Sequence, residues 1–143
     1  MAEINRAAKA LIRRESDSRY LVLTCSLWPE NPRRSQQPDL PGGTIEPGER
    51  IEEGLLREVQ EETGLQLSPD VLQLGYCFTR LRDDGVSNSF LLFTGETSGE
   101  ATITLSWEHE SYQWMTAKEV LDLSIRSPYP EMFQHLHTVG LLV

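Results

Sequence analysis

An apolar stripe within residues 50–64 is the clearest periodic pattern in this chain. Ile51, Leu55 and Val59 recur at every fourth position, which places their side chains on one face of an amphipathic helix. Gly64 follows the last of these turns, and glycine is the residue that most often ends a helix at that point. The pattern therefore predicts a helix over residues 50–64.

Short apolar runs separated by turn-forming residues predict strands on both sides of this helix. The strands are expected at residues 5–13, 19–27, 71–81, 87–95, 101–105 and 107–115. Two further helices are expected at residues 117–123 and from residue 127 onward. Thr116 and Glu119 have the spacing of a capping box for the first of them. This order of elements predicts an α/β fold in which helices cover both faces of a mixed sheet.

Composition and charge limit the class of protein. At 143 residues the chain is expected to form one domain over residues 1–143. A formal net charge of −9 argues against nonspecific binding to nucleic-acid duplexes, which requires basic patches. Neither a signal peptide nor a transmembrane span is recognisable, so no membrane partner is expected. Cys25 and Cys77 lie in apolar, strand-like runs, which favours buried free thiols in a reducing, cytoplasmic compartment.

The predicted helix carries more negative charge than its stability can use. Seven glutamates and only two arginines lie between residues 46 and 62. Glu58, Glu61 and Glu62 share one side of the helix, where like charges repel and the helix dipole disfavours anions. A bound cation would offset this repulsion, and Mg²⁺ prefers carboxylate and phosphate oxygens as ligands. A solvated acidic face is the alternative interpretation, and it accounts less well for the clustering.

The segment between residues 43 and 65 has charged and small residues at fixed spacing. They are Gly43, Glu49, Arg57, Glu58, Val59, Glu61, Glu62, Gly64 and Leu65. With U for an aliphatic residue, the pattern G-x5-E-x7-R-E-U-x-E-E-x-G-U resembles the Nudix box at every fixed position, over 23 of the 143 residues. The resemblance implies a Nudix-type α/β/α sandwich with a mixed sheet, in which the box forms a loop-helix-loop.

The resemblance to the Nudix family also implies roles for residues of the box. Glu58, Glu61 and Glu62 would bind Mg²⁺, with Mn²⁺ as the alternative ion. The backbone carbonyl of Gly43 would join them. Arg57 would hold one glutamate in place through charge-assisted hydrogen bonds, with Glu58 as the first choice.

Three groups outside the box are further candidates. In the Nudix family a metal-binding or base glutamate often comes from a loop near this position, and Glu108 is the first choice, with Glu110 second. Arg80 and Arg82 flank a strand end and could clamp phosphates. Trp28 could stack on a nucleobase. The structural interpretations are exposed loop acids, surface arginines and a partly buried tryptophan.

Other positions also bear on the site. Arg33 and Arg34, in a proline-rich loop before the box, could meet phosphate or be solvated. Gly54 lies inside the predicted helix at a cost of about 1 kcal/mol against alanine, which indicates close packing of the preceding loop. The role of His109 stays open, whereas His135 and His137 have a spacing that favours structural roles.

These residues fit metal-assisted hydrolysis of a phosphoanhydride, with Arg57, Glu58, Glu61 and Glu108 as the catalytic group. The base is left open between Glu108 and a metal-bound carboxylate. The expected substrate is a small nucleotide, in the first place a nucleoside or deoxynucleoside triphosphate that yields a monophosphate and pyrophosphate. ADP-ribose or a nucleotide sugar is the enzymatic alternative, and a catalytically silent ligand-binding module is the alternative of another class. A homodimer is left open.

Overall fold

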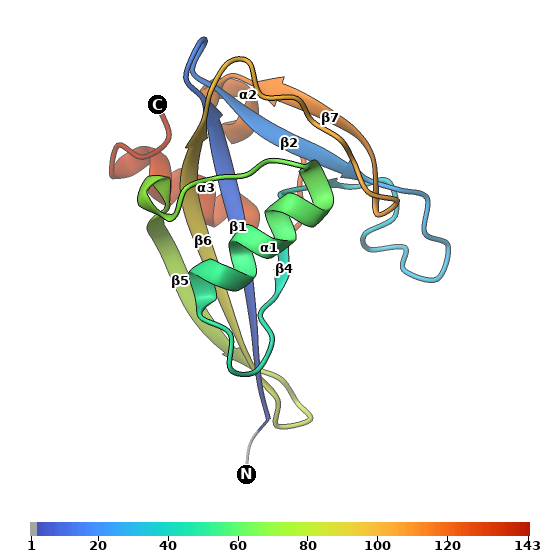
Figure 1. Cartoon of the computed structure of the whole chain (residues 1–143). Coiled ribbons are helices and arrows are strands. Elements are labelled where there is room, and N and C mark those ends of the chain that lie inside the picture. Colours follow the sequence, from blue (N-terminus) through green and yellow to red (C-terminus); the bar gives the residue numbers. More distant parts are fainter. Residues whose placement is uncertain (1–2) are drawn as a thin grey trace.

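A seven-stranded mixed sheet with helices on both faces forms the body of the molecule (Figure 1). The computed structural model describes residues 3–143. The strands are β1 (Ile4–Arg14), β2 (Arg19–Cys25), β3 (Pro38–Asp39), β4 (Gly42–Thr44), β5 (Gln73–Leu81), β6 (Ser87–Thr97) and β7 (His109–Met115). The helices are α1 (Ile51–Thr63), α2 (Ala117–Leu121) and α3 (Tyr129–Thr138), with a 3-10 turn at Pro69–Val71. The predicted α/β sandwich with a mixed sheet is confirmed.

Strand β1 organises the sheet because it pairs with three other strands. It runs parallel to β6 along its whole length, whereas its other edge is shared by two antiparallel partners. Residues 7–9 of β1 pair with β4, and residues 13–14 pair with β2. Strand β2 also forms antiparallel pairs with β7 and β3. The chain segment from Asp39 to Gly42 therefore crosses from β2 to β1, and Ala10 N–H donates to the carbonyl of Pro41 on the way.

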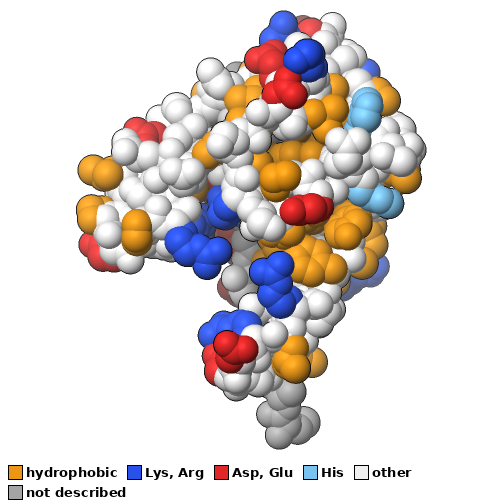
Figure 2. Space-filling view, turned by 180° about the vertical axis from the view of Figure 1, so that it is seen from behind, with side chains coloured by type: hydrophobic (Ala, Val, Ile, Leu, Met, Phe, Trp, Pro, Cys, Tyr) orange, Lys and Arg blue, Asp and Glu red, His pale blue; other side chains and the backbone are white. Residues whose placement is uncertain are grey.

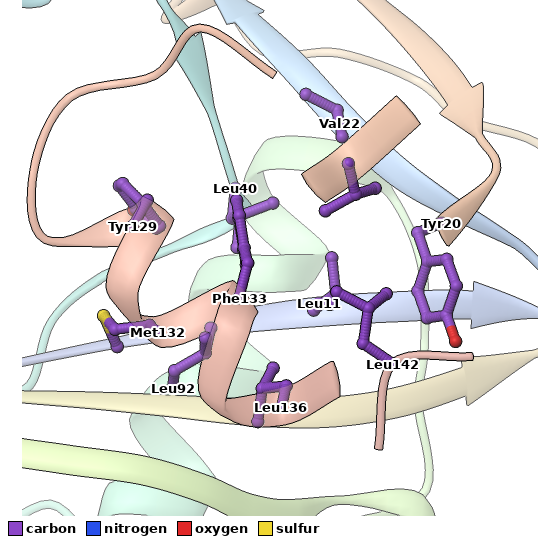
Figure 3. Close-up of a cluster of buried hydrophobic side chains, with 11 residues drawn as sticks. Leu11, Tyr20, Val22, Leu40, Leu92, Tyr129, Met132, Phe133, Leu136 and Leu142 are labelled. Atoms are coloured by element: carbon purple, nitrogen blue, oxygen red, sulfur yellow. The ribbon is translucent and has the colours of Figure 1, made fainter. Parts of the chain in front are cut away.

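Alternation along β1 sends its side chains into two separate cores. Ala8, Ala10 and Ile12 pack with Leu55 and other residues under α1. Leu11 points to the opposite face, where it meets side chains of α3. In Figure 3 the labelled α3 residues face the sheet from this side; they are Tyr129, Met132, Phe133 and Leu136. The sheet is thus buried on both faces, as expected for helices in two layers.

Helix α1 begins and ends close to where its sequence pattern predicts. Leu55 and Val59 are fully buried, and Ile51 is partly buried beside them. Gly64 adopts the left-handed conformation with φ of 77°, and its N–H donates to the carbonyl of Gln60. The capping box that Thr116 and Glu119 predict for α2 is present with both reciprocal hydrogen bonds. Local sequence signals therefore place both ends of α1 and the start of α2 to within one residue, whereas α2 ends at Leu121 and α3 begins at Tyr129, each two residues from the expected position.

Two predicted features are wrong, and each has a physical reason. Residues 101–105 do not form a strand, because the segment runs along the end of α1, where Thr104 N–H donates to the carbonyl of Thr63. Cys77 is exposed, although Cys25 is buried and both thiols are free. Cys77 lies on the edge strand β5, whose neighbouring residues Tyr76 and Phe78 pack towards α3 and leave the thiol on the other face.

None of the helices within residues 3–143 is both long enough and apolar enough to span a membrane.

The two cores predict how stability responds to truncation. Leu55→Ala removes a fully buried side chain beneath α1, so the free energy of unfolding should fall by about 2–5 kcal/mol. Leu74→Ala is the matched control, because Leu74 on β5 is 47% exposed and should change stability little. Urea denaturation followed by circular dichroism measures both. Equal losses for the two variants would contradict the assignment of the core.

Candidate functional site

Acidic and basic side chains from distant parts of the chain line one cavity of about 330 Å³. It lies where α1 and β4 meet the loop before β3, the turn before β7 and the loop between α2 and α3. Its lining residues are Ala7, Lys9, Arg34, Gly42, Gly43, Thr44, Glu58, Glu62, Glu108 and Arg126. The fold therefore brings together residues up to 119 positions apart in the sequence, from Ala7 to Arg126.

The predicted carboxylates divide into two groups. Glu58 and Glu62, one helical turn apart on α1, line the cavity, and Glu108 joins them from the turn before β7. The Glu61 side chain is 58% exposed, and its carboxylate lies 3.5 Å from Arg57 Nη1, outside the cavity lining. Glu110 is exposed as well. Because neighbouring helical residues diverge by about 100°, Glu61 and Glu62 point in different directions.

Arg57 holds the loop before α1 against the helix. Its Nε and Nη2 donate to the two oxygens of Glu49 at 2.8 and 3.0 Å, and its Nη1 donates to Glu58 Oε1 at 3.1 Å. Glu49 also accepts a hydrogen bond from Glu46 N–H at 2.8 Å. The hydrogen bonds from Arg57, followed by the one from Glu46, lower the pKa of Glu49 to about 2. One guanidinium thus fixes both the loop and a cavity-lining carboxylate.

Two glycines let backbone approach these carboxylates closely. A Cβ on Gly54 would lie 2.7 Å from Ile45 Cδ1 and 2.8 Å from Glu49 Oε1, which explains the helical glycine as expected. A Cβ on Gly43 would lie 2.9 Å from the carboxyl carbon of Glu58. The main chain of β4 therefore lies directly against the acidic side of α1.

Glu62 Oε2 and His109 Nδ1 lie near each other in the interior, and each is buried without a hydrogen-bond partner within residues 3–143. The Glu62 side chain is 4% exposed, and its Oε2 lies 3.6 Å from His109 Nδ1. Burial, reinforced by Asp39, Glu108 and Glu58 and opposed by Lys9, raises the pKa of Glu62 to about 8. A proton on Glu62 would give this pair a donor and an acceptor.

Asp39 is the centre of a buried polar network that the sequence pattern did not reveal. Its fully buried carboxylate lies 3.3 Å from Lys9 Nζ and accepts hydrogen bonds from Arg34, Arg126 and His109, each at 3.1 Å. Burial alone would raise the pKa of Asp39, but Lys9, His109 and the two arginines outweigh it and hold the pKa far below its usual value. A lysine inside the apolar run of β1 was the one signal that a buried partner had to exist.

Cys25, Asp39 and His109 also lie close enough together to resemble a metal-binding group. The charges there oppose a cation, because Asp39 already accepts from Lys9, Arg34 and Arg126. The carboxylates of the cavity fit a divalent cation better. Glu62 Oε2 is buried without a partner within residues 3–143, and hard ions such as Mg²⁺ take carboxylate oxygens as ligands.

A second cavity of about 420 Å³ adjoins the first, since Ala7 and Thr44 line both. Phe78 and Phe90 supply its aromatic surface, with their rings stacked at 5.9 Å. Its other lining residues are Asn5, Arg6, Arg80, Asn88, Ser89 and Pro128. Figure 2 shows basic side chains around a hollow near the middle of the rear face. Of the arginines predicted to contact phosphate, Arg80 lines this second cavity and Arg34 lines the first, whereas Arg33 lines neither.

Trp28 and Arg82 line neither of these two cavities. Trp28 packs edge-to-face against Trp107 with ring centroids 6.0 Å apart, and the Arg34 guanidinium lies over its ring. Arg82 forms a salt bridge of 2.6 Å with Asp84 in the turn between β5 and β6. In this structure Trp28 is thus partly buried and Arg82 is paired with an acid at the surface, and their contacts with a substrate stay predictions.

Comparisons with known proteins agree with this geometry. The family profile described as NUDIX domain matches residues 4–136. Nucleoside triphosphatase NudI of Escherichia coli O1:K1 / APEC is 29% identical over 123 residues, which cover 78% of this chain and 84% of that protein. The crystal structure of a MutT protein from Methanosarcina mazei Go1 is 26% identical with a TM-score of 0.80, over 97% of this chain and 96% of that one. A Mutator MutT protein from Bacillus halodurans is 25% identical with a TM-score of 0.71, over 92% and 81%.

The buried carboxyl of Glu62 predicts a pH dependence of stability in metal-free protein. Glu62 ionises near its usual 4.5 when unfolded but near 8 when folded, so the folded state binds more protons between these values. The free energy of unfolding should therefore fall as pH rises through this window, by roughly 5 kcal/mol at most. Glu62→Gln should remove this decline.

Urea denaturation at several pH values in the presence of a chelator measures the effect. Glu61→Gln is the matched control, because its exposed carboxylate borders solvent and should leave the decline in place. Parallel pH profiles for wild type and Glu62→Gln would contradict the raised pKa.

Proposed function

Because the chain belongs to the Nudix family, we propose that it is a Mg²⁺-dependent pyrophosphohydrolase of nucleoside or deoxynucleoside triphosphates. The products would be a nucleoside monophosphate and pyrophosphate. The observation that carries this proposal is the cavity in which Glu58, Glu62 and Glu108 meet basic residues, beside a second cavity with an aromatic surface. The similarity to a nucleoside triphosphatase supports the choice of substrate.

The metal would be held by the acidic residues of the first cavity. Glu58, Glu62 and Glu108 supply the side-chain oxygens, and Gly43 brings its main chain beside them. Glu61 would act from the rim, through its contact with Arg57. Mg²⁺, when bound, would neutralise part of the negative charge on the phosphate oxygens.

The protein side chains would provide orientation and proton transfer. Arg57 keeps the Glu58 carboxylate in one orientation, because the guanidinium is itself fixed by two hydrogen bonds to Glu49. Glu108 is partly exposed in the cavity, and no cation lies within ion-pairing distance of its carboxylate among the described residues. It is therefore our candidate to orient the attacking water and accept its proton.

The nucleoside would occupy the second cavity. Phe78 and Phe90 offer an apolar surface for the base, and the side-chain amides of Asn5 and Asn88 offer donors and acceptors for its edge. Arg80 lies at the same cavity, with its guanidinium 5.7 Å from the Phe78 ring centre, and could contact the phosphate next to the sugar. Since Ala7 and Thr44 border both cavities, one substrate can reach from the aromatic surface to the carboxylates.

A substrate panel with Mg²⁺ tests this proposal. It would contain nucleoside and deoxynucleoside triphosphates, ADP-ribose, nucleotide sugars and dinucleoside polyphosphates, with pyrophosphate and monophosphate products quantified. We expect a triphosphate to stand well above the rest. A preference for ADP-ribose or a nucleotide sugar would support hydrolysis of a phosphoanhydride but contradict the proposed triphosphate substrate. No turnover with retained Mg²⁺ binding would favour a ligand-binding module.

Matched glutamine variants test the acidic group. Glu58→Gln and Glu62→Gln should each lower kcat by about 100-fold or more, because each removes a charged oxygen ligand. Both should also weaken Mn²⁺ binding, measured by electron paramagnetic resonance, so that the loss is assigned to the ion. Glu110→Gln is the control, since Glu110 is exposed and outside the cavity lining. Full activity in either of the first two variants would refute this metal site.

A further inference from the structure

Acids and bases share the first cavity without pairing with each other. Glu58, Glu62 and Glu108 supply three carboxylates, and the basic residues are Lys9, Arg34 and Arg126. Within residues 3–143, none of these three bases lies within 4.0 Å of any of the three carboxylates. Opposite charges around a small cavity would normally pair, so the arrangement fits a ligand that places a cation beside the acids and an anion beside the bases.

The bases are held away from the acids by Asp39. Arg34 Nη2 donates to one oxygen of its carboxylate and Arg126 Nη2 donates to the other, each at 3.1 Å, while Lys9 Nζ lies 3.3 Å from both. One negative charge therefore serves three cations. Excess positive charge therefore remains on the basic side of the cavity, where a ligand with several negative charges can neutralise it.

The two arginines are fixed before any ligand binds. Arg126 Nη1 donates to the carbonyl of Pro38 at 2.9 Å, and its guanidinium lies 5.2 Å from the ring centre of Tyr129. The Arg34 guanidinium lies 5.6 Å from the ring centre of Trp28, and its Nη2 is held by Asp39. Guanidinium groups with restricted motion lose little entropy when they bind phosphate.

We propose that Arg34 and Arg126 form a clamp for the phosphate chain of the substrate, and that Asp39 is the positioning residue of this clamp. The inference rests on the proposed function, because it assigns the basic half of the same cavity. The arginines come from two loops, one before β3 and one between α2 and α3, that only the fold brings together. The clamp would hold non-bridging oxygens through charge-assisted hydrogen bonds while the carboxylates hold the cation.

Binding of inorganic pyrophosphate in the presence of Mg²⁺ tests the clamp directly by calorimetry. Arg34→Met and Arg126→Met should each weaken this binding by about 10- to 100-fold, because each removes charged hydrogen bonds. Arg33→Met is the matched control: Arg33 is exposed, adjacent to Arg34, and outside the cavity lining, so its affinity should equal that of wild type. Once a triphosphate substrate is known, KM should rise in the two clamp variants and stay unchanged in the control.

Two further variants separate binding from folding. Arg34→Lys and Arg126→Lys keep a positive charge beside Asp39 but lose the planar pair of donors, so they should fold and still bind pyrophosphate several-fold more weakly. Wild-type affinity and KM in both lysine variants and in every methionine variant that folds would overturn the clamp and leave the arginines a structural role. Loss of pyrophosphate binding in the clamp variants, with no turnover of any triphosphate by wild type, would sustain the clamp and overturn the proposed function.

Discussion

The fully buried carboxylate of Asp39 connects the segments that meet at the site. It bonds to Lys9 on β1, to Arg34 before β3, to Arg126 before α3 and to His109 on β7. A buried charge is unfavourable unless it is paired, and the buried ammonium of Lys9 would also be unfavourable without the carboxylate. The orientation of two loops and the basic side of the cavity therefore depend on one side chain.

Folding and chemistry use different faces of α1. The face that carries Leu55 and Val59 packs on the sheet and accounts for the position of the helix. The face that carries Glu58 and Glu62 contributes repulsion and desolvation, which oppose folding in the absence of a cation. Arg57 reduces this repulsion, because its guanidinium pairs with Glu49 and Glu58, and it also keeps the Glu58 carboxylate at the cavity. The helix is thus less stable than its apolar packing would allow, and the difference is located at the site.

Local signals in the sequence predict the helices and most strands because their causes are local. The apolar stripe and Gly64 define α1, and Thr116 with Glu119 defines the start of α2. Residues 101–105 escape such reasoning, since their hydrogen bonds go to the end of a helix forty positions away and not to a strand. The fixed spacing of acids in α1 indicates a metal site, but only the direction of each side chain separates Glu62 from Glu61.

The basic half of the cavity was harder to predict for a different reason. Lys9 and Asp39 lie thirty positions apart, and Arg126 is a further eighty-seven positions from Asp39. No periodic pattern relates residues at such separations. Lys9 and Asp39 come into contact because β3 pairs with β2 and β4 pairs with β1, so the segment from Asp39 to Gly42 runs from β2 to β1. Tertiary topology, and not local preference, creates this part of the site.

If Glu62 holds the metal as proposed, its raised pKa makes protons and metal ions compete for the same carboxylate. At neutral pH the metal-free carboxyl holds a proton, because burial raises its pKa to about 8. A divalent cation that takes Glu62 as a ligand must displace that proton into solvent. The apparent affinity for the ion then increases about tenfold for each pH unit up to the pKa, and the heat of binding includes the ionisation of the buffer. The fraction of protein that holds the ion would thus depend on the pH as well as on the concentration of the ion.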